Sequence, residues 1–140
     1  MEELINKFVM VNPLLTDDPT RMQGQVGLIE SIDLEKDEVM VKFPNNDIGA
    51  YSADALLSLQ PKEMLLDTIK AKLVELDPKD VRILLDIYRL QNIAEPVAFE
   101  EAFRWAIAFE NVANNSLVSL EDYLSQGFSE NIQLQTSRGR

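Results

Sequence analysis

The chain of 140 residues contains no cysteine and no histidine. Without cysteine it has no disulfide, no thiol nucleophile and no thiolate metal ligand. Without histidine it has no imidazole base, no Ser-His-Asp triad and no histidine-ligated zinc. These two absences remove most common hydrolase designs. We therefore predict no enzyme activity, and no catalytic, cofactor-binding or metal-binding residues.

Long apolar segments are also missing. No run approaches the roughly 20 apolar residues that a membrane helix needs. The first ten residues, MEELINKFVM, place two acids before the first base and offer no cleavage site of small residues, so they do not resemble a signal peptide. We expect a cytoplasmic protein without a membrane segment.

Positive charge is scarce. The chain has 13 Lys or Arg against 24 Asp or Glu, a net charge of −11. A field of this sign repels a phosphate backbone, so we expect no nucleic-acid binding and favour a basic protein partner. Nucleic-acid binding would need Lys7, Arg21, Lys36 and Lys42 to converge. The acidic segment DLEKDE (33–38) lacks the glycine of a cation-binding loop, which favours a solvated acidic surface.

The first half of the chain, before Pro61, is typical of short strands. Residues 7–15 predict a strand that ends at Asn12-Pro13. Residues 25–33 and 38–44 predict a hairpin with a charged tip, because Val39, Val41 and Phe43 alternate with Met40 and Lys42. Residues 48–56 predict a last short strand, with Ser52 as the cap of a one-turn helix over 53–57.

This half resembles the small SH3-like β-barrel modules, in the loose sense that includes KOW-like and Tudor-like domains. The resemblance covers about residues 5–60 and lies in four segments: Gly24-Gln25-Val26-Gly27, Val39 to Phe43, Gly49-Ala50-Tyr51, and Leu56. It implies a fold rather than an activity. A Tudor-like reader needs an aromatic cage. We interpret Phe8, Phe43 and Tyr51 as core residues instead, and the glycines as sites of bending and close packing.

The second half is typical of helices. Apolar residues at helical spacing predict a first helix through Leu65, Ile69, Leu73 and Leu76. A second helix begins with Asp77 as N-cap and Pro78 at the first position. A third helix runs from Pro96 to about Asn114-Asn115. A short fourth helix has Ser119 as its cap and Gly127 as its stop.

These elements predict an α+β protein. Residues 1–61 form an SH3-like barrel, residues 62–127 form a three- to four-helix unit packed on it, and residues 128–140 form a flexible tail. The connection at Gln60-Pro61-Lys62 is short, which favours packing of the two halves against each other.

The predicted third helix is apolar nearly all round, so several neighbours or a second chain must bury it. In one interpretation it is the central helix of the domain. In the other, Trp105 and Phe109 anchor an interface, to which Tyr88 of the second helix contributes. A homodimer would satisfy the second interpretation.

The composition and the apolar helices together favour a non-enzymatic protein–protein interaction module, an adaptor or regulatory subunit. Two alternatives remain open. An acidic inhibitor or immunity-type protein would block a basic nucleic-acid enzyme, and would carry its acids on one face. A carboxylate-dependent enzyme would need two buried acids in one concave pocket.

Overall fold

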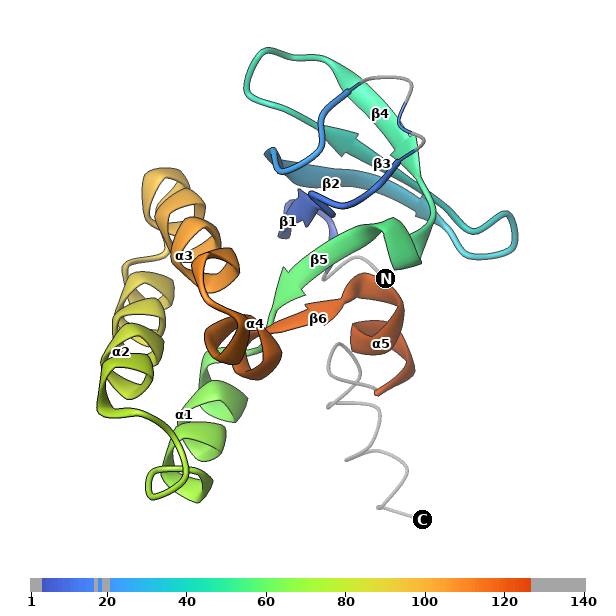
Figure 1. Cartoon of the computed structure of the whole chain (residues 1–140). Coiled ribbons are helices and arrows are strands. Elements are labelled where there is room, and N and C mark those ends of the chain that lie inside the picture. Colours follow the sequence, from blue (N-terminus) through green and yellow to red (C-terminus); the bar gives the residue numbers. More distant parts are fainter. Residues whose placement is uncertain (1–3, 17, 19–20, 127–140) are drawn as a thin grey trace. The chain divides into compact units, whose positions relative to one another are not determined.

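The computed structural model describes residues 4–16, 18 and 21–126, and the chain is an α+β protein (Figure 1). It divides into two compact units. Unit 1 comprises Met1–Ser58 and Ser119–Arg140, and unit 2 comprises Leu59–Val118. The predicted stop at Gly127 and the predicted tail over 128–140 lie outside the described residues.

The strands form one sheet in the order β4-β3-β2-β1-β5-β6. Their bounds are β1 Phe8–Val11, β2 Val26–Asp33, β3 Glu38–Lys42, β4 Ile48–Tyr51, β5 Leu56–Leu59 and β6 Leu117–Ser119. The pairs β1–β2, β1–β5, β2–β3 and β3–β4 are antiparallel. In the described part of the chain β4 and β6 end this order without pairing with each other, so the sheet is open. The predicted closed barrel is not confirmed.

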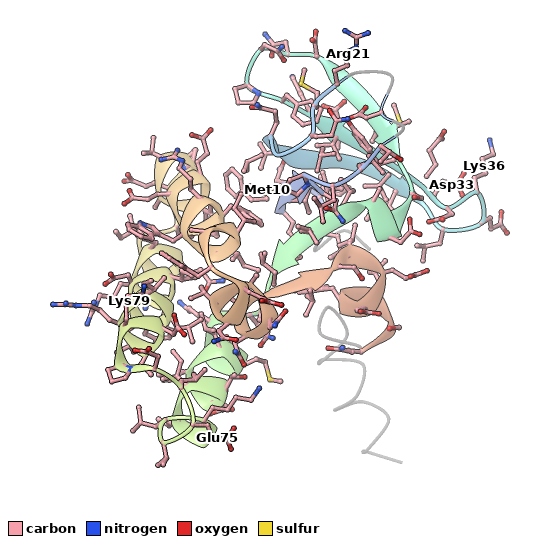
Figure 2. All side chains as sticks on the ribbon, viewed as in Figure 1. Met10, Arg21, Asp33, Lys36, Glu75 and Lys79 are labelled. Atoms are coloured by element: carbon pink, nitrogen blue, oxygen red, sulfur yellow. The ribbon has the colours of Figure 1, made fainter. Side chains whose placement is uncertain are left out.

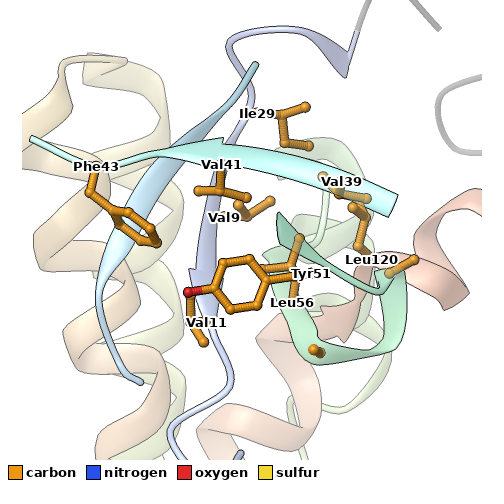
Figure 3. Packing of buried hydrophobic residues seen from close by; sticks show 11 residues of the cluster. Val9, Val11, Ile29, Val39, Val41, Phe43, Tyr51, Leu56 and Leu120 are labelled. Carbon is orange, nitrogen blue, oxygen red and sulfur yellow. The ribbon is translucent and has the colours of Figure 1, made fainter. Parts of the chain in front are cut away.

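The core of unit 1 lies on one face of this sheet (Figure 3). Val39 and Val41 of β3 are buried while Lys42 is exposed, which confirms the predicted alternation. Phe43 and Tyr51 are buried there and meet edge to face, with 6.3 Å between ring centroids. They are core residues, as expected, whereas Phe8, also expected in the core, is only half-buried. The cluster also holds Val9, Val11, Ile29, Ala53, Ala55, Leu56 and Leu120.

The β2–β3 hairpin follows its local sequence. The Asp33 carboxylate accepts hydrogen bonds from the backbone N–H groups of Glu35 and Lys36, at 3.1 and 3.3 Å. Asp37 adopts a left-handed φ of 50°, which Asp tolerates. The register then shifts between Ile29 and Ser31, which bends the sheet. The predicted hairpin is confirmed.

The segment after β4 differs from the prediction. Ala53–Ala55 is a single 3-10 turn (η2), and the Ser52 side chain does not cap it. The Ser52 hydroxyl bonds the Asp54 carboxylate instead, and the Ala53 N–H donates to Asp37 Oδ1 at 3.0 Å. A one-turn helix does begin at Ala53, as predicted, but it ends at Ala55 rather than at residue 57, because Leu56 pairs with Val11 and so begins β5.

Unit 2 contains four helices in its described sequence: α1 Lys62–Ala71, α2 Pro78–Ile93, α3 Pro96–Ala108 and α4 Glu110–Ser116. The start of α2 confirms the prediction, since Asp77 Oδ1 accepts the Lys79 N–H at 3.0 Å and Pro78 occupies the first position. The helix ends at Ala94, whose left-handed φ of 60° reverses the chain. Only two residues then separate α2 from α3.

The predicted first helix is too long. It ends at Ala71, and the Lys72 N–H closes its last turn on the Thr68 carbonyl. Leu73 is 56 % exposed and Val74 is 97 % exposed. Apolar spacing alone suggested a helix here, but the residues before Asp77 turn to reach the extended backbone that this cap requires.

The predicted third helix is divided. Its backbone becomes extended at Phe109 (φ −136°, ψ 140°), which ends α3 and precedes α4. Figure 1 shows α4 turned away from the axis of α3. The break allows α4 to bury Val112, Asn115 and Ser116. Trp105 therefore lies on α3, whereas Phe109, expected on the same helix, lies at the break that follows it.

The last described helix, α5, spans Leu120–Ser125 and belongs to unit 1. Ser119 caps it as predicted, since its hydroxyl accepts the Asp122 N–H at 3.0 Å. Leu120 is fully buried in the core of unit 1, where α5 packs on η2. A helix late in the sequence thus completes the core that the early strands begin.

Candidate functional site

The three residues predicted for an interface take different positions. Trp105 on α3 is 40 % exposed and Phe109, in the link to α4, is 37 % exposed. Tyr88 on α2 is half-buried. Among the residues that the structure describes, Trp105 is therefore the large aromatic side chain exposed on a regular helix.

The inward and outward faces of α3 differ in composition. Ala98, Ala102, Phe103 and Ala106 are its buried residues, and three of them are small. We define the α3 outer stripe as Val97, Glu101, Arg104 and Ala108, all of which are exposed. Their spacing of four, three and four residues places them in one row along the helix. Trp105 stands beside this row.

A shallow hollow lies on the outer stripe. It has a volume of about 290 Å³, and Glu101, Arg104, Trp105 and Ala108 line it. Ala108 leaves space in it because its side chain is only a methyl group. The opposite charges of Glu101 and Arg104 flank an apolar floor, which suits a protein side chain better than a multiply charged ligand.

Phe109 is held within unit 2. The Lys79 ammonium group lies 4.6 Å from the centroid of its ring, a cation–π contact between the start of α2 and the α3–α4 link. The ring therefore already has an intramolecular partner. Of the two aromatic anchors proposed from sequence, Trp105 is the one whose neighbours on the outer stripe are exposed.

Most of the net negative charge belongs to unit 1. Leu59–Val118 carries ten acidic and seven basic residues, a net charge of −3, whereas the remaining 80 residues carry fourteen and six, a net charge of −8. Seven of the fourteen form what we define as the acidic end: Asp33, Glu35, Asp37, Glu38, Asp54, Glu121 and Asp122.

These seven carboxylates come from three neighbouring segments. Five belong to the hairpin tip and to η2, which the bond from Ala53 to Asp37 joins. The other two are in the first turn of α5, which packs on η2. Lys36 is the one basic side chain in the hairpin tip, where it lies close to Asp33 (Figure 2). The acids are thus gathered rather than spread evenly.

The four basic residues that could have formed a cationic patch do not converge. Figure 2 shows Arg21 and Lys36 at separate places on unit 1. Lys7 points its ammonium group at the Tyr123 ring, 4.2 Å from the centroid. Burial lowers the pKa of the Lys7 amine to about 8, because the charged form loses its hydration.

Buried acids occur singly among the described residues. Asp18 of unit 1 accepts hydrogen bonds from the Tyr51 hydroxyl and the Met22 N–H. Asp80 of unit 2 is contacted by the Asn111 amide at 3.4 Å. The described part of the chain contains no group of three or more side chains suited to a metal ion. None of its helices combines the length and apolar content needed to cross a bilayer.

Neither a protein-family model, nor a curated protein, nor a solved structure matches this chain. The argument about function therefore depends on the residues themselves. The feature that sequence reasoning missed is the outer stripe. Its signal was present in the spacing of Val97, Glu101, Arg104 and Ala108, but only the burial of the opposite face of α3 shows that this face is left outward.

Proposed function

We propose that this chain is a non-enzymatic protein–protein interaction module, an adaptor or regulatory subunit that binds its partner through the α3 outer stripe and Trp105. The observation that carries the proposal is the exposure of apolar side chains on a regular helix. Val97 is 72 % exposed and Trp105 is 40 % exposed. Tryptophan is the residue type most enriched among side chains that dominate binding energy.

The surroundings of Trp105 support this proposal. The ring borders a hollow with an apolar floor and a charged rim, which is the usual arrangement of a small interface. Ile93, at the end of α2, is 55 % exposed and precedes Val97 by four residues. The apolar lining of the hollow, with these exposed side chains on the same two helices, favours an interaction site over a purely solvated face.

Site-specific photo-crosslinking in living cells tests the proposal. A benzophenone amino acid at position 97 should capture a protein, and Trp105→Ala should weaken the capture several-fold. The same probe at position 89, an exposed site on α2 (66 % side-chain exposure), is the matched control. Equal capture from positions 97 and 89, or no capture from position 97, would contradict the proposal.

The acidic end supports a second candidate, an inhibitor that binds a basic nucleic-acid enzyme. This function requires acids gathered on one surface, and seven carboxylates occupy adjoining segments of unit 1. Their field would accelerate association with a basic surface and would weaken as salt increases. Replacing Glu35, Glu38 and Glu121 by Gln should slow association with a basic nuclease at low salt. Replacing Glu63, Glu95 and Glu100 of unit 2 should not.

We further propose that unit 1 is a member of the SH3-like class and that the protein is cytoplasmic. The first proposal is supported by five short antiparallel strands that bend around one core, with β1 between β2 and β5. An experimental structure of the full chain, with its strand order and the closure of its sheet, would test it. Fractionation of cells would test the location.

A further inference from the structure

We propose that the partner of the α3 outer stripe is a second copy of this chain, and that two α3 helices pair antiparallel about a two-fold axis. This inference rests on the proposed function, since it names the partner of the same surface. It is carried by the positions of the four residues of the outer stripe, which are symmetric about the middle of α3.

The symmetry is one of position. Val97 and Ala108 are equidistant from a point between Ala102 and Phe103, and Glu101 and Arg104 are equidistant from the same point. When two copies of a helix pair antiparallel about a two-fold axis, residues equidistant from the axis face each other. A single axis therefore brings Val97 opposite Ala108 of the second copy and Glu101 opposite Arg104 of the second copy.

The spacing fits the geometry of paired helices. Steps of four, three and four residues are those of the a and d positions along a coiled-coil seam. All four residues of the stripe are exposed, so no other described part of the chain already occupies this seam. The buried residues Ala98, Ala102, Phe103 and Ala106 belong to the opposite face of α3.

The chemistry of the facing residues is complementary. A branched side chain, Val97, meets the small Ala108, where the hollow beside Trp105 leaves room. The carboxylate of Glu101 meets the guanidinium of Arg104, and the two-fold axis makes this pairing twice. A parallel arrangement would instead place Glu101 against Glu101 and Arg104 against Arg104. The charges therefore select the antiparallel orientation and its register.

Trp105 would cover the charged layer that the two Glu101–Arg104 contacts form between the helices. A two-fold axis between antiparallel helices keeps both Trp105 rings on the same side of the pair. The rings are displaced from each other by about 7.5 Å along the helix axes, at about 1.5 Å per residue. Each ring would thus lie over one of the Glu101–Arg104 contacts and lose part of its 40 % exposure.

The dimer should be weak. A helix of 13 residues is only about 20 Å long, so the interface belongs to the small, transient class. Two copies of net charge −11 also repel each other. Salt screens this repulsion over about 8 Å at physiological ionic strength. We therefore expect the dimer to become more stable as salt increases from low values. The Glu101–Arg104 salt bridges taken alone would become weaker, but the loss of net repulsion is the larger effect.

The test uses the full chain and its single tryptophan. Sedimentation equilibrium from about 10 µM to about 1 mM, a range suited to weak binding, should show a monomer–dimer equilibrium, with the Trp105 emission shifting to shorter wavelength as the dimer forms. Glu101→Arg and Arg104→Glu should each abolish the dimer, because each gives the layer four charges of one sign. An equimolar mixture of the two variants should restore it as a heterodimer.

The mixture distinguishes lost pairing from lost folding, since two misfolded variants would not rescue each other. Glu75→Arg makes the same charge change in the turn between α1 and α2 and should not abolish the dimer. A chain that stays monomeric at every concentration would overturn the inference, as would dimers in both single variants or a mixture that does not associate. Capture of a different protein from position 97, with no self-association, would overturn this inference and leave the proposed function standing.

Discussion

The Tyr51 hydroxyl donates a hydrogen bond to the Asp18 carboxylate at 3.1 Å, across 33 residues of sequence. Both side chains are buried, at 6 % and 8 % exposure. Asp18 also accepts the Met22 N–H at 2.9 Å. The carboxylate thus joins the segment after β1 to the edge strand β4, and its charge is held by donors from two parts of unit 1.

Removing the Tyr51 hydroxyl should destabilise unit 1. Tyr51→Phe keeps the ring and its contact with Phe43, but it takes a donor from a buried carboxylate. We expect the free energy of unfolding to fall by about 1–3 kcal/mol. Urea denaturation followed by circular dichroism measures the change. Tyr88→Phe, at a half-buried site on α2, is the control. Equal stabilities of Tyr51→Phe and the wild-type protein would show that the bond contributes nothing.

Lys7 should make stability depend on pH. Its pKa is lowered from 10.5 to about 8 by burial, so between these values the unfolded chain binds more protons than the folded one. Stability therefore rises with pH across this window and is reduced below pH 8. Lys7→Met removes the penalty. The free energy of unfolding of Lys7→Met should exceed that of the wild-type protein, and this difference should shrink by about 2 kcal/mol between pH 7 and pH 9.5.

The matched control for this measurement is Lys36→Met at the exposed hairpin tip. The Lys36 side chain is exposed, so this variant makes the same change of charge without the burial that affects Lys7. Denaturation by urea at pH 7, 8, 9 and 9.5 gives both comparisons. A constant difference between Lys7→Met and the wild-type protein at all four pH values would contradict the prediction.

Gly27 should not tolerate a side chain. A Cβ there would lie 2.6 Å from Val41 Cγ1 and 2.8 Å from the Lys42 carbonyl oxygen. The carbonyl belongs to the neighbouring strand and cannot move without disturbing the sheet. We expect Gly27→Ala to lower the unfolding free energy by about 1–3 kcal/mol. Gly24 has open space around it and a left-handed φ of 78°, which Asn tolerates better than other side chains, so Gly24→Asn should cost less than Gly27→Ala. The two midpoints of thermal unfolding provide the comparison, and coincident midpoints would refute it.

The caps of two helices offer a matched pair. Asp77 accepts the Lys79 N–H at the start of α2, whereas Glu95, at the start of α3, makes no side-chain capping bond. Both helices have proline in the first turn. Asp77→Ala should cost about 1 kcal/mol, and Asp77→Ser should recover most of it. Glu95→Ala should change stability little. A similar loss of stability in Asp77→Ala and Glu95→Ala would mean that the Asp77 capping bond adds nothing to the effect of a negative charge at the helix start.

Local sequence was sufficient where a few adjacent residues determine the structure. Asp77-Pro78 and Ser119 mark helix starts because their oxygen atoms reach an N–H two or three residues ahead. The hairpin over residues 33–38 formed as expected for the same reason. The absence of histidine and cysteine limited the available chemistry without any knowledge of the fold.

Local sequence was not sufficient where contacts between residues far apart in the chain determine the structure. Apolar periodicity continues past Ala71 and past Ala108, yet both helices end there, because a repeating pattern does not record where the chain must turn to reach its next contact. Leu56 begins a strand because Val11 is available to pair with it. Neither β5 nor β6 was predicted as a separate strand, since such short segments are defined mainly by their neighbours.

The sequence by itself determined the α+β class, the acidic character and the row of Val97, Glu101, Arg104 and Ala108 at coiled-coil spacing. Only the tertiary structure decided that this row faces outward, that Leu120 of the last described helix enters the core of the first strands, and that the acids of three segments adjoin. Helix and strand starts depend on bonds between near neighbours, whereas exposure and the gathering of charges depend on contacts between residues far apart in the chain.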